Sequence, residues 1–470
     1  MAEPFTPATH DDPPRRRRSR LHLLWQIPLL LVLLLVLAGV VLHSVAKHRV
    51  DTRLAAIRQA GEPTTLEELQ QWYATPADNA ADWIEPLIAS IDLDIADDTP
   101  LPPIMDDNWA IGMPLTDAHR QTTQALLDLH DSQLTRLREA DWRNVEARYP
   151  VDLAQGLDTL LPHYGQLRTT ARLLALHGLM ACDRGDVDDA LRDVEVIRGL
   201  GRTLDREPIL ICFLVDLSLD EISRKLAQHI LLTADLTDPQ LQRLQAIVQS
   251  PDRTPQFVRA LAGERGLGLG TFFDDRLGFM GNPPSLLSAV WKGSGVKYLD
   301  EAAGIDAYNL MIDSAARPYD QAPDIEQYID NLPVIYLCTR IMVPPLDVAF
   351  ATTVRYQAAN DLAVLTIAAK RYQLKYGRWP ARLDELAPEF VPDVPNDPFS
   401  PGGLSPYRYE PRPGGVILYS LGKDGVDDAG VRYGADGEEY QPGTDIVFEC
   451  PTAAGRMTPQ FPGVGQSEKN

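Results

Sequence analysis

Histidine is missing from the second half of the chain, and the signatures of common hydrolases are missing throughout. All nine histidines lie before residue 230, and none of them forms an HExxH pair. The chain also has no GxSxG elbow and no SxxK motif. These gaps exclude the usual signatures of zinc and serine hydrolases. We expect His163 and His177 to lie in or beside a helical core.

Cysteine is scarce, with four residues at positions 182, 212, 338 and 450 and no CxxC pair. The usual zinc and redox spacings are therefore excluded. A helix expected at about 187–204 holds Cys182 and Cys212 roughly 25 Å apart at 1.5 Å per residue. This separation is too long for a disulfide bond between them. We expect free, buried thiols.

Positive charge is scarce beyond the N-terminus. The chain has a net charge of −22, but its first 50 residues hold seven basic and three acidic side chains, so the rest carries −26. A body of this charge repels nucleic acid and anionic lipid. Nucleic acid is therefore excluded as a partner.

Only one long apolar run is present, the uncharged stretch from Leu21 to Ala46, which follows "RRRRSR". Its length is sufficient to cross about 30 Å of hydrocarbon as a helix. Flanking arginines stay in the cytoplasm. We therefore predict a basic cytoplasmic tail at 1–20, a transmembrane helix at 21–46 and a body outside the cytoplasm, in a single-pass protein of the inner membrane. A cleaved signal peptide is the alternative, although its apolar region is normally shorter, about 7 to 15 residues.

Residues 47–346 are expected to form an extracytoplasmic domain of stacked amphipathic helices. "LALHGLMACDRGDVDDALRDV" resembles one tetratricopeptide-type hairpin, but no second copy follows. Glycine and proline interrupt the pattern at 263–335, where we expect an irregular insertion. "GLGLG" within it lacks the spacing of a nucleotide-binding loop. "PVIYLCTRIMVPPLDVAF" is interpreted as a core segment, because its charges and prolines exclude a second span.

Residues 347–450 have a different pattern, with a helix at about 347–376 followed by turn residues and short β-rich runs. The runs are "PYRYE", "GVILYSLG" and "DIVFEC", which predict a small antiparallel sheet. The polar tail 451–470 is expected to be flexible. The predicted fold is thus mainly α-helical with a small C-terminal α+β domain.

This C-terminal part resembles the major pseudopilin of bacterial type II secretion, the type II secretion protein G family. The resemblance covers about 95 residues, a fifth of the chain. It rests on an ordered series of motifs: Tyr376, Gly377, Trp379-Pro380, Leu383, Leu386, Val394-Pro395, Asp397-Pro398-Phe399, Tyr407, Tyr409, Leu418 to Gly422, Asp424-Gly425 and Asp445-Ile446.

The resemblance implies a calcium ion held by the loop "YSLGKDGVDDAG" and the strand that closes the sheet. Asp424 and Asp445 are the implied side-chain ligands, joined by Asp427 or Asp428 and by backbone carbonyls. Clustered aspartates and glycines suit the six to eight oxygen ligands that calcium takes. The alternative is a polar turn in which the aspartates bind only their own backbone. An EF-hand is excluded, because Ala435 stands where a bidentate Glu is needed.

Two features depart from a pseudopilin. The apolar run begins "LHLLWQIPLLL", without an acidic residue at its head, and some 300 residues separate it from the pseudopilin-like part. We therefore expect a borrowed domain on a non-catalytic, membrane-anchored structural or interaction protein of the bacterial envelope. One alternative is an exported hydrolase or carbohydrate-active enzyme with its site near "GERGLGLG", where Glu264 and Arg265 form either an ion pair or a polar site. Another is a secretion-system component.

Overall fold

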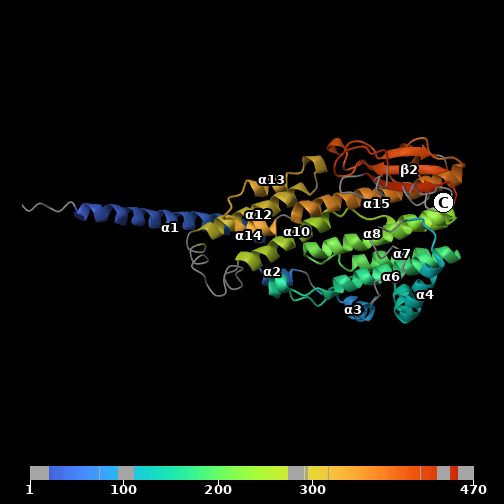
Figure 1. The fold of residues 1–470 in the computed structure, drawn as a ribbon, viewed down its shortest axis with the longest axis horizontal. Coiled ribbons are helices and arrows are strands. Elements are labelled where there is room, and N and C mark those ends of the chain that lie inside the picture. The colour runs from blue at the N-terminus through green and yellow to red at the C-terminus, as the bar shows by residue number, and fades with distance from the viewer. Residues whose placement is uncertain are drawn as a thin grey trace, which may run out of the picture.

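The computed structural model describes residues 21–72, 75–93, 111–273, 291, 295–315, 317–343, 345–412, 414–430 and 445–453. They form a mainly helical protein with one long apolar N-terminal helix and a small C-terminal antiparallel sheet (Figure 1). This confirms the fold class predicted from the sequence. The predicted tail 1–20 and most of the tail 451–470 lie outside the described residues.

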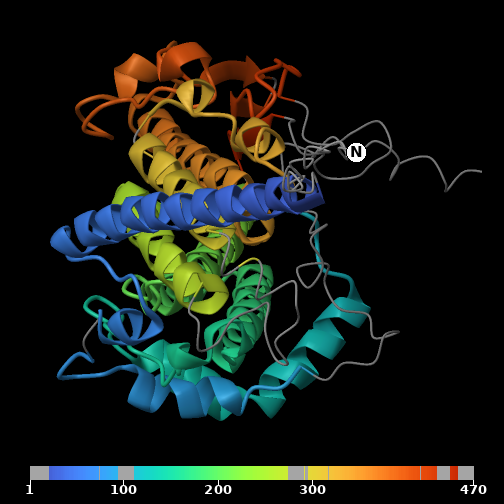
Figure 2. The ribbon, with the colours of Figure 1, turned by 90° about the vertical axis from the view of Figure 1, so that its left-hand side faces the viewer.

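Helix α1 (Leu21–Gln59) extends beyond the predicted span without a break. Among the described residues it is the helix that has the length and composition to cross a membrane. Its apolar side chains are exposed from Ile27 to Val45, whereas its C-terminal third packs onto the body. The buried side chains of that third are Ala46, Val50 and Ile57. Figure 1 shows α1 projecting from one end of the body, the end that faces the viewer in Figure 2.

The body is a stack of helices around two hydrophobic clusters. Gly185, in the left-handed conformation, ends α6 and allows α7 to fold back as the predicted hairpin. The helices between α1 and the π-helical turn Leu269–Phe273 are α2 (Leu66–Gln71), α3 (Ala81–Ala89), α4 (Asp117–Leu129), α5 (Asp131–Glu139), α6 (Pro162–Arg184), α7 (Val187–Arg202), α8 (Leu210–Thr233), α9 (Asp238–Val248) and α10 (Thr254–Gly268).

The segment 263–335 is helical over much of its described length, which corrects the expectation of an irregular insertion. It holds the end of α10, the π-helical turn, α12 (Val296–Ser314) and α13 (Ile325–Asp330). Its glycines serve close packing. A Cβ on Gly263 would lie 1.5 Å from the carbonyl oxygen of Pro208, and one on Gly270 would lie 2.5 Å from Leu66 Cγ. The glycines thus let other elements approach α10 and the π-helical turn.

The stretch "PVIYLCTRIMVPPLDVAF" is only half a core segment. Its helix α14 (Leu337–Met342) buries Cys338 and Met342, but Leu337 and Ile341 on the other side are exposed. Residues one turn apart share a face of a helix. The apolar composition hid this two-sided arrangement.

Helix α15 (Pro345–Tyr376) lies between the helical body and the sheet (Figure 1). The sheet has the order β1 (Arg408–Arg412), β2 (Gly415–Ser420), β3 (Ile446–Pro451), with both pairings antiparallel. All residues of β2 and β3 are buried. One hydrophobic cluster includes Leu167 of α6, Leu362 of α15 and Phe448 of β3, so residues 347–450 and the helical body share a core.

Candidate functional site

The acidic loop that follows β2 is the site that the sequence singled out. Asp424 is exposed, and its Oδ1 accepts a hydrogen bond from the Val426 N–H at 3.1 Å. Asp427 accepts hydrogen bonds from Tyr419 Oη at 3.1 Å and from the Ala429 N–H at 3.0 Å. Both aspartates therefore hold the loop itself, as the polar-turn alternative expects.

Asp445 differs from them because it is buried immediately before β3. Its Oδ2 accepts a hydrogen bond from the Gly430 N–H at 2.9 Å. Its Oδ1 is buried and has no hydrogen-bond partner among the described residues. Burial raises the pKa of Asp445 to about 6; the Gly430 N–H opposes this shift, and the charges of Asp428 and Asp427 reinforce it. These carboxylates therefore lie near enough to repel one another.

The described part of this loop fits a calcium site in one respect and is incomplete in another. An unpartnered, buried carboxylate oxygen surrounded by negative charge is the environment that a hard cation stabilises. However, no group of three or more His, Cys, Asp or Glu side chains positioned for a metal occurs in the described ranges, which omit 431–444. The calcium site implied by the resemblance remains a prediction, with Asp445 as its best-placed ligand.

Other residues of the resemblance have structural contacts. The buried Asp397 accepts hydrogen bonds from Ser420 Oγ at 2.6 Å and from the Leu421 N–H at 3.0 Å, which ties the "DPF" turn to the end of β2. Tyr407 donates to Asp361 of α15 at 2.9 Å. Tyr409 donates to the Pro380 carbonyl at 2.9 Å. These motif residues hold the sheet against α15 and fix where the acidic loop begins.

A second polar cluster, which we call the ion network, lies inside the body and was not predicted. It consists of Arg198 on α7, Asp216 and Asp220 on α8, Arg253 at the start of α10 and Tyr356 on α15. Arg253 pairs with Asp216 at 2.9 Å and with Asp220 at 2.8 Å. Arg198 and the Tyr356 hydroxyl also contact Asp220. The network thus joins three body helices to α15.

In the ion network, the effect of burial on each acidic group is opposed by the charge of a neighbouring arginine. Burial raises the pKa of Asp216 to about 6, against the opposing charge of Arg253. Burial also acts to raise the pKa of Tyr356, but the charges of Arg198 and Arg253 outweigh it and lower that pKa. A buried ion pair of this kind has little net effect on stability while it is intact, yet removing one partner is costly.

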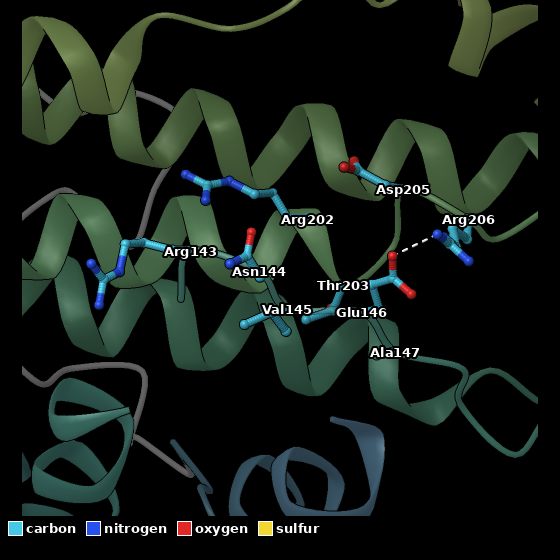
Figure 3. A pocket seen from close by; sticks show the side chains of 9 residues that line it. All are labelled: Arg143, Asn144, Val145, Glu146, Ala147, Arg202, Thr203, Asp205 and Arg206. Atoms are coloured by element: carbon cyan, nitrogen blue, oxygen red, sulfur yellow. Dashed lines mark hydrogen bonds and ion pairs between the residues drawn. The ribbon is translucent and has the colours of Figure 1, made fainter. Parts of the chain in front are cut away.

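A shallow pocket of about 480 Å³ lies on the surface beside the ion network (Figure 3). Its lining includes Arg143, Arg202 and Arg206 together with Glu146 and Asp205. Arg206 pairs with Glu146, and Asp205 pairs with the buried Arg253 at 3.0 Å. Arg143 pairs with Asp141 outside the lining, whereas Arg202 donates to the Trp142 carbonyl at 3.0 Å. Two of the three arginines of the pocket are therefore held in ion pairs.

His163, His177 and Glu264, which the sequence singled out within the body, have structural partners. His163 stacks on Tyr149 with ring centroids 4.3 Å apart, and burial lowers its pKa to about 4. His177 Nδ1 lies 2.6 Å from the buried Asp193 carboxylate. Both histidines belong to the helical core, as expected. Glu264 accepts a hydrogen bond from the Leu210 N–H at 3.0 Å, which caps the start of α8.

Arg265 is buried and pairs with Glu62, so its charge is neutralised inside the body. All four cysteines are free, as expected; Cys182 is half-buried and the others are buried.

Comparisons with protein-family models, with curated proteins and with solved structures found no match. The class that the fold defines is a mainly helical protein with one apolar N-terminal helix and a small terminal sheet.

Proposed function

We propose that this protein is a single-pass, membrane-anchored interaction protein of the bacterial envelope, with its body outside the cytoplasm and a calcium-stabilised, type II secretion protein G-like part at its distal end. The observation that carries the proposal is the continuity of α1. The helix passes from exposed apolar turns directly into turns that are buried in the body. Such a helix acts as a stiff stalk rather than as a flexible tether.

Specific contacts support the rigid attachment. The guanidinium of Arg53 on α1 forms two hydrogen bonds of 2.8 Å with the carboxylate of Asp306 on α12. His43 packs edge-on against Tyr298 with ring centroids 5.0 Å apart. A bidentate arginine–carboxylate pair fixes orientation as well as distance. The body would thus be held at a defined height and angle above the membrane.

The described residues bring together no group of three or more His, Cys, Asp or Glu side chains positioned for a metal. A membrane-held body suits a role in holding or binding other envelope proteins. The exported-hydrolase alternative loses its main support, because Glu264 and Arg265 serve helix capping and an internal ion pair. The partner would be another envelope or secretion protein. Calcium, when bound, would neutralise the acidic loop through Asp424 and Asp445, joined by Asp427 or Asp428.

Topology tests the proposal most simply in intact cells whose outer membrane has been permeabilised. Leu404 is 78 % exposed on the pseudopilin-like part, so Leu404→Cys offers a reactive thiol there. In a chain that carries Cys182→Ser, we expect a membrane-impermeant maleimide to label Leu404→Cys without lysis and to label Ser19→Cys only after lysis. The full-length chain should stay in the membrane after a carbonate wash. A shortened, soluble chain would contradict the proposal and favour a cleaved signal peptide.

A further inference from the structure

Four large apolar side chains are exposed together around the start of α14. They form what we call the apolar patch, which consists of Val334, Ile335, Leu337 and Ile341, with exposed fractions between 44 % and 76 %. No charged residue occurs from Asn331 to Thr339. An exposed apolar patch of this kind marks a surface for a protein or a membrane.

The position of the patch along α1 follows from three contacts. Helix α12 runs beside α1 in the same direction, because Tyr298 meets His43 and Asp306 meets Arg53 further along both helices. Asp300 of α12 therefore lies about 3 Å beyond the level of His43, at 1.5 Å per residue. That level is close to Ala46, where the uncharged run of α1 ends.

The same aspartate holds the start of α14. The carboxylate of Asp300 accepts hydrogen bonds from the Cys338 and Thr339 N–H groups, each at 3.0 Å, and Thr339 Oγ1 donates to the Asp300 carbonyl at 2.7 Å. The first turn of α14 is thereby fixed at the level where the uncharged run of α1 ends. Figure 1 shows α12 and α14 at the end of the body from which α1 emerges.

The one charged side chain between Val334 and Ile341 is engaged away from the patch. The guanidinium of Arg340 donates to the carbonyls of Ile329 and Leu332, at 2.9 and 3.0 Å, and so closes the end of α13. Tyr336, half-buried between the exposed residues, is of the type enriched at membrane–water interfaces. The chemistry of the patch is therefore that of an interfacial segment.

We propose that the apolar patch enters the interfacial layer of the bilayer that α1 spans, as a second contact with the same membrane. This inference rests on the proposed anchoring by α1. Two contact points, the stalk and the patch, would fix the rotation of the body about α1 as well as its height. The contact is apolar, so it persists although the acidic body repels anionic headgroups.

The test uses the full chain, carrying Cys182→Ser, reconstituted into vesicles of phosphatidylcholine and phosphatidylglycerol. An environment-sensitive dye is attached to Val334→Cys or Ile341→Cys, with Leu404→Cys as the matched exposed control on the pseudopilin-like part. We expect lipids that carry a nitroxide near the headgroup to quench the dye at 334 and 341 at least several-fold more than at 404. Emission at 334 and 341 should also shift to shorter wavelength.

Flotation of the vesicles separates the two proposals. If the chain floats with the vesicles but the dye at 334 and 341 is quenched no more than at 404, the patch faces water and this inference is overturned while the anchor stands. If the chain does not float, the anchor fails and the inference fails with it. Co-flotation with strong quenching at 334 and 341 supports both.

Discussion

The ion network and the acidic loop both gather aspartates, but they differ in how the negative charge is balanced. In the network, Asp220 contacts Arg198, Arg253 and Tyr356, and Asp216 pairs with Arg253. In the loop, Asp445 is held by the backbone N–H groups of Gly430 and Asp428 and leaves its Oδ1 without a described partner. Asp216 of the network also has an oxygen without a hydrogen-bond partner, but an arginine pairs with its carboxylate. A balanced cluster holds helices together, whereas an unbalanced one is where a cation would add stability.

The largest expected loss of stability comes from removing an arginine of the ion network. Arg253→Met leaves Asp216 and Asp220 buried with less compensation, and breaking a buried pair in this way costs about 3–5 kcal/mol. We expect denaturant unfolding of the full chain in detergent to show this loss. Arg143→Met, which breaks an exposed pair with Asp141, is the matched control and should leave the midpoint unchanged. An equal response of both variants would remove the structural role of the network.

A smaller effect, of opposite sign, is expected at Asp445. An acid whose pKa is about 6 in the folded chain and near 4 in the unfolded chain favours folding at low pH and opposes it as the pH rises from 4 to 6. In EDTA, Asp445→Asn should therefore raise the melting midpoint at pH 7 and have little effect at pH 4. A lower midpoint at pH 7 would mean that the carboxylate is already balanced within the protein.

The smallest effect is expected at the exposed attachment of α1 to α12. Arg53 and Asp306 keep 32 % and 45 % of their side chains exposed. Solvent screening limits such a pair to about 0.2–1 kcal/mol. A double-mutant cycle of Arg53→Gln and Asp306→Asn, followed by denaturant unfolding, should give a coupling in that range. A coupling as large as that of the network would make α1 a determinant of folding rather than a stalk.

Local patterns were enough to predict much of the fold. The uncharged run, the hairpin at Gly185 and the run of β-formers before Ser420 are each contained within a short stretch, so propensity and spacing indicated them. The glycines of "GLGLG" were read as part of an irregular insertion, because their close packing against Pro63, Met342 and Leu66 depends on distant residues. The exposed side of α14 was hidden for the same reason.

The candidate sites differ in the same way: one is contained in a short sequence motif, and the other brings together residues that are distant in the sequence. Asp445 was named from its place in a motif, and it is the aspartate of the acidic loop that has a buried oxygen without a partner. Arg198, Asp220, Arg253 and Tyr356 are far apart in the sequence, and on separate helices they read as ordinary polar positions. The available signal was weak: charged residues among apolar neighbours, as in the α8 stretch "ICFLVDLSLDEI".

Calcium binding by the full chain tests the central contrast most directly. We would measure the melting midpoint in EDTA and in calcium for the wild type, for Asp445→Asn and for Asp384→Asn, an exposed carboxylate used as the control. Calcium at a hundred times its dissociation constant should add about 2.7 kcal/mol. The account predicts that rise in the wild type and in Asp384→Asn and its loss in Asp445→Asn. A midpoint that calcium leaves unchanged in the wild type would contradict it and make "YSLGKDGVDDAG" a polar turn.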